Sequence, residues 1–339
     1  MANTLKDVAS AAKVSSATAS LVLNGLAEGR VSEEVANRVI ATAKNLNYRP
    51  NLVARSLRTQ ESKTIGLISD QIATTPFASQ MLAGAQLLAA KEHWLLFVVN
   101  ADGDKEVEAS ASRALIQHNV TGFIYASMYH REVEVPKVIN NKNVVLLDCF
   151  DNSNQYHSII PNEYGGARNA VAFLVKNGHT KIAHITDGEN KFAAPLREKA
   201  YKEVLNENGI EFNKNYLLKT PSSNATEGYE ATKKLLQLKV PPTAIFAYTD
   251  RMAMGAYAAI HEAGLKVGED ISVIGFDNQP DIASAMRPGL TTIQLPHFEM
   301  GELATEILIK QLQNSESETP IRHLIDCPLV VRDSVGPAR

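Results

Sequence analysis

The sequence predicts an N-terminal all-α helix-turn-helix head with a hinge helix, followed by an α/β core of two doubly wound lobes. Two observations indicate this fold. Residues 4–24 carry two short amphipathic helices separated by a tight turn, and from residue 64 onward short apolar runs alternate with helical stretches. A chain of 339 residues is also longer than one compact core needs. We therefore expect a head at 1–49, a hinge helix and linker at 50–63, and a core at 64–339.

The first two helices of the head are marked by caps and by apolar spacing. Thr4 can cap the first helix with Asp7 three residues on, and the apolar positions are Leu5, Val8, Ala9 and Ala12. After a short break at Lys13 and Val14, Ser15 can cap a second helix. The residues of this helix that are expected to be buried, beneath Val14, are Ala19, Val22 and Leu23. The second helix of such a pair is the one that enters a DNA major groove, although a plain helical hairpin in a core has the same pattern.

A third helix is predicted at residues 33–45. Ser32 is the expected N-cap, and the expected buried stripe is Val35, Val39, Ile40, Ala43 and Leu46. Pro50 can then open a helix of two or three turns with no core to pack on. Such a segment could be a hinge, but the pattern alone favours an ordinary linker. Residues 1–60 have a net charge of +4, whereas residues 61–339 have −7, as expected for a head that meets phosphates and a body that does not.

The core is predicted to hold two series of buried parallel strands alternating with helices. The strands of the first series are 64–69, 95–99, 122–126, 144–148 and 157–161, with helices at 78–91 and 107–118. The strands of the second are 182–186, 216–220, 244–248 and 271–276, with helices at 163–177, 194–208, 227–238 and 250–263. The lobes are expected at 64–160 plus 292–325 and at 161–291 plus 326–339, with a ligand at the carboxyl ends of the strands.

Composition and motifs argue against several other classes of protein. Two cysteines are too few for a disulfide framework, no apolar run is long enough to span a membrane, and the N-terminus is not a secretory signal, so we expect a cytoplasmic protein. No glycine-rich nucleotide loop, nucleophile elbow or zinc-protease motif is present, and the nine histidines have no metal-ligand spacing. We expect neither a cofactor nor an enzyme.

Three stretches, TLKDVASAAKVSSATASLVLNG, RVSEEVANRVIATAKNLNYRPN and VARSLR, resemble the head of the lactose repressor/galactose repressor family of bacterial transcription regulators. The resemblance continues through NGHTKIAHIT, TDRMAMGAYAAIHEAGLKVGEDISVIGFDN and LTTIQLPHFEMG, where the core is similar to the periplasmic sugar-binding fold. It implies a homodimer on a pseudo-palindromic operator. It also implies a hinge helix in the minor groove, where Leu57 is the wedge between base pairs and Arg55 and Arg58 flank it.

The resemblance also implies the residues that contact operator DNA. Ser16, Ala17 and Leu21 match base-reading positions, but these side chains cannot form the bidentate contacts that dominate direct readout. Lys13 stands where the family usually has glycine, so a left-handed turn would cost about 1–2 kcal/mol. The remaining expected DNA contacts are Thr4, Lys6, Ser15, Thr18, Ser20, Asn24, Arg30, Asn51 and Ala54.

Effector contacts are expected from strand ends and from the same resemblance. Asp277 and Asp148 end strands, and each can accept hydrogen bonds from sugar hydroxyls. Arg197 matches a ligand-binding arginine of several members of the family. Thr249 replaces a common asparagine. Further expected contacts are Pro76 and Phe77 as an aromatic wall, with Pro161 and Ser223 in a roomy pocket and Met128, Asp102 and Gln294 at its rim.

The sequence thus predicts a DNA-binding transcription regulator, a repressor, controlled by a small carbohydrate in the cleft of its core. Corepression by a nucleoside-like or purine-like ligand is the alternative within the family. A sugar-binding protein without a regulatory role is a second alternative, but the head at residues 1–59 argues against a transporter component. An enzyme of the two-lobed α/β kind is a third, without a positioned nucleophile and base to support it.

Overall fold

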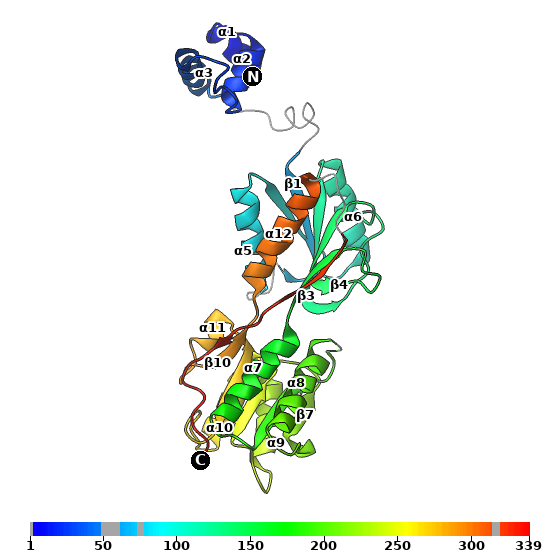
Figure 1. Ribbon diagram of the computed structural model, residues 1–339, viewed down its shortest axis with the longest axis vertical. Helices are drawn as coiled ribbons and strands as arrows, with labels where there is room; N and C mark the ends of the chain where they lie inside the picture. Colours follow the sequence, from blue (N-terminus) through cyan, green and yellow to red (C-terminus); the bar gives the residue numbers. More distant parts are fainter. Residues whose placement is uncertain (1–2, 49–61, 73–77, 191, 314–318) are drawn as a thin grey trace. The chain divides into compact units, whose positions relative to one another are not determined.

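The computed structural model describes residues 3–48, 62–72, 78–190, 192–313 and 319–339. The chain separates after Ser62 into a small helical unit, here called the head, and a large α/β unit, the core (Figure 1). The predicted hinge helix falls on residues 49–61, outside the described residues. No described helix is both long and apolar enough to cross a membrane.

The head consists of α1 (Leu5–Ala11), α2 (Ser16–Leu23) and α3 (Glu33–Asn45) around one small core. The predicted caps are confirmed. Thr4 and Asp7 form a full capping box on α1, and the Ser15 hydroxyl accepts from the backbone N–H of Thr18 on α2. Lys13 has φ 54°, so the turn between α1 and α2 takes the left-handed form without a glycine. The side chains that fill the head core are Val8, Ala12, Ala19, Val22, Val39 and Ala43.

One expectation for α3 needs correction. Ile40, predicted to be buried, is 53% exposed, because Val39 and Ala43 already fill the contact with α1 and α2. Ser32 occupies the N-cap position but makes no side-chain capping bond. A contact that the sequence pattern does not indicate joins α3 to α1, since Arg38 Nε donates to the carbonyl oxygen of Ala12 at 3.0 Å.

The first lobe of the core is a parallel six-stranded sheet in the order β11-β5-β4-β3-β1-β2. Its strands are β1 (Thr64–Ser69), β2 (Leu95–Asn100), β3 (Gly122–Glu132), β4 (Asn143–Phe150), β5 (His157–Pro161) and β11 (Arg322–Ile325). Its helices are α5 (Ser79–Lys91), α6 (Lys105–Gln117) and α12 (His297–Gln313). Figure 1 shows α5 and α12 side by side on one face of this sheet, where they pack against each other.

The second lobe repeats the plan in the order β12-β10-β9-β8-β6-β7, with only β12 antiparallel to its neighbour. Its strands are β6 (Ile182–Asp187), β7 (Leu217–Thr220), β8 (Ala244–Ala247), β9 (Ser272–Asp277), β10 (Thr291–Gln294) and β12 (Leu329–Val330). Its helices are α7 (Glu163–Lys176), α8 (Ala193–Glu207), α9 (Ala225–Leu236), α10 (Asp250–Glu262) and the short α11 (Pro280–Ala283). The two doubly wound lobes predicted from the sequence are confirmed.

The division between the lobes differs from the prediction at one point. Strand β10 pairs with β9 and β12, so residues 291–294 belong to the second lobe and not, as expected for 292 onward, to the first. The chain therefore passes between the sheets three times: from β5 into α7, from β10 into α12, and from β11 into β12. Three separate connections restrain the lobes while leaving the strand ends facing one another.

Glycines set the distance between the helices that cover each sheet. A Cβ atom on Gly84 of α5 would lie 2.0 Å from the backbone oxygen of Phe298, and one on Gly301 of α12 would lie 2.1 Å from that of Met81. The α9 and α10 pair has the same construction at Gly228 and Gly255, where a Cβ would lie 2.1 and 1.9 Å from backbone oxygens. Both helix pairs thus approach until backbone meets backbone, which requires a residue without a side chain.

We expect Gly84→Ala to destabilise the first lobe by about 1–3 kcal/mol, because the added methyl group overpacks a backbone contact that cannot give way. Helix propensity alone would stabilise the variant by about 1 kcal/mol. The sign of the change in the free energy of unfolding therefore distinguishes overpacking from helix propensity. The single tryptophan, Trp94, directly follows α5 and its fluorescence reports unfolding of this lobe in denaturant. Ala83→Leu on the exposed side of α5 is the control and should change stability by less than about 0.5 kcal/mol. A stabilised Gly84→Ala variant would contradict the packing argument.

Candidate functional site

The head presents a polar face around the start of α2. Among the residues predicted to contact DNA, Thr4, Lys6, Ser15, Ser16, Ala17 and Arg30 are exposed, and Thr18, Leu21 and Asn24 are half-buried. The N-terminal turn of α2 therefore offers small side chains and free backbone N–H groups, which suit close approach to a phosphate backbone. Thr18 shares a 2.9 Å hydrogen bond with the Ser15 hydroxyl, so the two side chains are held in one arrangement.

Ser20 departs from the expectation. Its side chain is buried, and Asn24 Nδ2 donates to its hydroxyl at 3.2 Å and to its carbonyl oxygen at 2.6 Å. The Ser20 side chain therefore lies largely within the head and, through Asn24, helps to end α2. The remaining expected contacts of hinge and cleft, Asn51, Ala54, Arg55, Leu57, Arg58, Pro76 and Phe77, lie outside the described residues.

In the core, a cavity of about 50 Å³ lies where the carboxyl ends of the strands of both lobes converge. Seven of the predicted effector residues line it: Met128, Asp148, Pro161, Arg197, Ser223, Thr249 and Asp277. Gln294 is not among the residues that line the cavity, and its side chain accepts a hydrogen bond from Asn278. Asp102 accepts from Gln71 at 2.6 Å and is likewise not among the lining residues. The Thr249 hydroxyl is already engaged, since it caps α10 and donates to the Ser223 carbonyl.

Several lining residues are not among the predicted contacts. They are Tyr129 and His130 in the last part of β3, Asp187 at the end of β6, and Glu163, Asn190, Tyr248, Arg251, Leu295 and His297. Most of them lie within a few residues of a predicted contact, so strand ends alone could have indicated them. Glu163 is the exception. It lies at the start of α7, where an acidic residue is expected for helix-dipole reasons, and only the fold brings it to Arg197.

Arg197 and Glu163 form a buried ion pair beside the cavity. Arg197 Nε lies 2.7 Å from Glu163 Oε2, and both side chains are only 3% exposed. Arg197 Nη1 also donates to the Tyr248 carbonyl at 2.5 Å, and the guanidinium stacks 3.4 Å from the centre of the Phe276 ring. Burial alone would lower the pKa of Arg197, but Glu163, Tyr248 and Asp277 together outweigh it and raise that pKa. Arg197 is therefore first a structural element of the cavity wall, tying α8 to α7 and to the end of β8.

Two strand-end aspartates face the cavity in strained backbone conformations. Asp148 has φ 53° and Asp277 has φ 114°, in the region that favours glycine. Burial raises the pKa of Asp148 well above its usual value, with Glu163 and Asp70 adding to the effect. Burial also raises the pKa of Asp277 to about 6, although Arg197 acts in the opposite direction. Backbone strain at both carboxyls is the kind of local cost that clusters at functional sites.

A buried hydrogen-bond chain holds the carboxyl of Asp277. The side chain of Asp250, fully buried, accepts from the Thr292 hydroxyl at 2.6 Å and from the Gln279 backbone N–H at 2.7 Å. Gln279 Nε2 in turn donates to Asp277 Oδ2 at 2.8 Å. Asp148 is different, because its Oδ1 atom is buried and has no hydrogen-bond partner within the described part of the chain. The carboxyl of Asp277 is thus held in position by its hydrogen bond. The Oδ1 atom of Asp148 is available to accept a hydrogen bond or, when protonated, to donate one.

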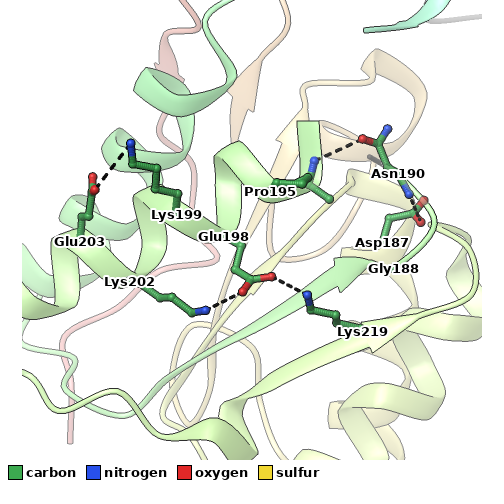
Figure 2. A pocket seen from close by; sticks show the side chains of 10 residues that line it. Asp187, Gly188, Asn190, Pro195, Glu198, Lys199, Lys202, Glu203 and Lys219 are labelled. Carbon is green, nitrogen blue, oxygen red and sulfur yellow. Dashed lines mark hydrogen bonds and ion pairs between the residues drawn. The ribbon is translucent and has the colours of Figure 1, made fainter. Parts of the chain in front are cut away.

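A wider groove of about 700 Å³ adjoins the cavity on the outer side of α8 and shares Asp187 and Asn190 with it. Figure 2 shows its charged side chains paired with one another: Glu198 lies between Lys202 and Lys219, at 2.6 and 2.9 Å, and Lys199 faces Glu203. Burial would raise the pKa of Glu198, but the hydrogen bonds from the two lysines outweigh it and lower that pKa. The lysine and glutamate side chains of this groove therefore neutralise one another.

Neither metal chemistry nor a positioned nucleophile emerges from the site. No group of three or more histidine, cysteine or acidic side chains among the described residues could hold a metal ion. The cavity instead offers convergent carboxyls, a buried guanidinium and aromatic rings, which recognise a small polar molecule.

We expect Arg197→Ala to lower the free energy of unfolding of the core by about 3–5 kcal/mol, because it leaves the buried Glu163 carboxylate without its partner. The matched control is Arg168→Ala, which breaks a pair with Glu207 whose side chains are 32% and 50% exposed and which should cost at most about 1 kcal/mol. Differential scanning calorimetry of both variants checks this. Equal, small effects would mean that Arg197 is not a structural anchor.

Comparison with known proteins agrees with this division of the chain. Residues 4–51 match the family model described as bacterial regulatory proteins, lacI family, and residues 171–335 match the periplasmic binding protein-like domain. The HTH-type transcriptional repressor PurR of Aliivibrio salmonicida is 32% identical over 94% of this chain and 95% of its own length. The ribose operon repressor of Escherichia coli is 33% identical over 91% of this chain and 93% of its own.

A solved structure of the lac repressor dimer bound to operator and the anti-inducer ONPF has a TM-score of 0.81 and 30% identity, covering 99% of this chain and all of that one. These relatives are transcription regulators and not enzymes. The similarity extends over nearly the whole chain and includes both the head and the two-lobed core. This chain therefore belongs to the LacI family of DNA-binding transcription repressors.

Proposed function

We propose that this repressor is controlled by a small uncharged carbohydrate bound in the cavity of its core. The observation that carries the proposal is the pair of buried strand-end carboxyls, Asp148 and Asp277, facing one cavity in strained backbone conformations. A carboxylate accepts two or more hydroxyl hydrogens, and an array of hydroxyls is what a sugar presents. The Arg197 guanidinium would supply the complementary positive charge.

The named relatives leave two ligand classes open, since one is a ribose operon repressor and others are PurR proteins, which suggest a purine effector. We favour a sugar because carboxyl groups dominate the polar lining, with Asp148, Glu163, Asp187 and Asp277 all present. A planar base would need flat apolar faces on both sides. Corepression by a purine-like ligand is the second candidate, and the PurR relatives are its support.

Ligand entry requires the lobes to move. The cavity of about 50 Å³ is far below the roughly 300–1,000 Å³ usual for ligand sites, so a sugar enters only if the strand ends separate. Binding would then shift the population between two arrangements of the lobes. We propose that the liganded arrangement binds operator DNA less well, so that sugar and DNA oppose each other.

The exposed start of α2 is the proposed reading element of the head. Ser16 and Ala17 would lie against base edges, while Ser15 and Thr18 would hold phosphates. Leu21 offers only apolar contact, so the base pair opposite it should favour a thymine methyl or tolerate change. The hinge residues Asn51, Ala54, Arg55, Leu57 and Arg58 would enter the minor groove at the operator centre, as their resemblance to the family implies. A regulator of this kind acts in the cytoplasm, where the DNA is.

We also propose a homodimer. Its support is the solved lac repressor dimer, which matches this chain over nearly its whole length. The edge strand β2 adds a physical reason: Leu95, Phe97 and Val98 are 50%, 37% and 43% exposed. Leu87 of α5, the helix before that strand, is 55% exposed as well. An exposed apolar edge of this kind is suited to association with a second copy.

The test is operator binding measured by fluorescence anisotropy on DNA from upstream of the chain's own gene and its neighbours. The titration is repeated with D-ribose, D-glucose, cellobiose and hypoxanthine at matched salt. We expect nanomolar operator binding, and a loss of about tenfold or more with at least one sugar. Tighter operator binding with hypoxanthine, and no response to any sugar, would instead support the corepressed alternative and contradict the sugar proposal.

A further inference from the structure

His130 is a buried histidine in the cavity wall that the predicted effector contacts do not include. It lies near the end of β3, two residues after Met128, and its side chain is 8% exposed. Both of its ring nitrogens are buried, and neither has a hydrogen-bond partner among the residues that the structure describes. A buried polar atom without a partner costs about 1–3 kcal/mol, so an arrangement with two of them on one ring requires an explanation.

Neighbouring rings hold this imidazole in place. Phe150 meets it edge to face with ring centres 5.5 Å apart, and Phe150 is in turn contacted by Phe192 of the second lobe at 5.4 Å. The Arg322 guanidinium stacks 4.3 Å from the centre of the Phe150 ring. The His130 ring is thus positioned by apolar and stacking contacts, which leave its nitrogens available to the cavity.

The ring is in the neutral form that recognises a hydroxyl. Burial lowers the pKa of His130, and the effect of Glu163 in the opposite direction is smaller. A neutral imidazole has one N–H donor and one nitrogen acceptor. A hydroxyl group can satisfy either nitrogen, because it both donates and accepts. Asp148 Oδ1 also lines the cavity, is buried and has no hydrogen-bond partner among the described residues, so it adds a third position.

We propose that His130 is a specificity-determining residue that, together with Asp148, hydrogen-bonds neighbouring hydroxyls of an uncharged polyol and discriminates against its phosphate esters. This inference rests on the proposed sugar-binding function. A phosphate group only accepts hydrogen bonds from such a site, so it would leave the acceptor nitrogen unsatisfied. It would also bring negative charge next to Asp148, Glu163 and Asp277, which line the same cavity. Of the two arginines in that lining, Arg197 and Arg251, Arg197 is already paired with Glu163.

Isothermal titration calorimetry on the full-length protein tests this. D-Ribose, D-glucose and cellobiose are compared with ribose 5-phosphate and glucose 6-phosphate. The variants are His130→Phe, which keeps a ring against Phe150, and Asp148→Asn, with His118→Phe on the exposed end of α6 as the control. We expect a neutral sugar to bind the wild type, to bind His130→Phe and Asp148→Asn about tenfold or more weakly, and to bind the control normally.

Stability provides the second readout. His130→Phe removes two buried nitrogens without described partners, so its unfolding midpoint should equal or exceed that of the wild type while sugar binding falls. A variant that lost binding and stability together would show a packing role and overturn the proposal. Sugar binding unchanged in His130→Phe, or tighter binding of a phosphate ester than of its parent sugar, would also overturn it and leave the proposed function intact. Absence of binding by any sugar would overturn the proposed function itself.

Discussion

The buried pair between Arg197 and Glu163 is the interaction on which the core of this repressor depends. It joins the first residue of α7 to the second turn of α8, and a further bond from Arg197 reaches the end of β8. Removing two charges from water is costly, and the cost is offset only when each charge is fully partnered. Here the guanidinium has a carboxylate, a carbonyl oxygen and two aromatic faces around it. The pair therefore fixes the geometry of the cavity wall before any ligand is present.

That same cluster determines the charge of the cavity. Asp148 and Asp277 both have raised pKa values because they are buried, and Glu163 adds to this while Arg197 acts against it. A raised carboxyl pKa means that the folded protein keeps a proton that the unfolded chain releases between about pH 4 and pH 6. The stability contributed by protonated Asp277 is therefore lost as the pH rises through that range. A ligand that hydrogen-bonds these carboxyls would recover part of that cost.

Much of the fold follows from local pattern, and the site follows only in part. The capping residues Thr4 and Ser15, the left-handed turn at Lys13 and the apolar runs of the parallel strands are local signals, and they predicted the elements well. Ile40 shows the limit of periodicity, because which face of a helix is covered depends on partners far away in sequence. The assignment of β10 failed for the same reason, since pairing with β9 and β12 is a long-range property. Strand ends indicated Asp148 and Asp277, but no local signal connects Glu163 with Arg197, 34 residues away.

The strand-end carboxyls form a water-excluded cluster beside Arg197. The most direct test is the pKa of Asp277, followed by NMR of carboxyl-labelled aspartates in the free protein and assigned with Asp277→Asn. We expect a pKa of about 6. A value near 4, that of an ordinary exposed aspartate, would show that water reaches the carboxyl freely and would contradict the account.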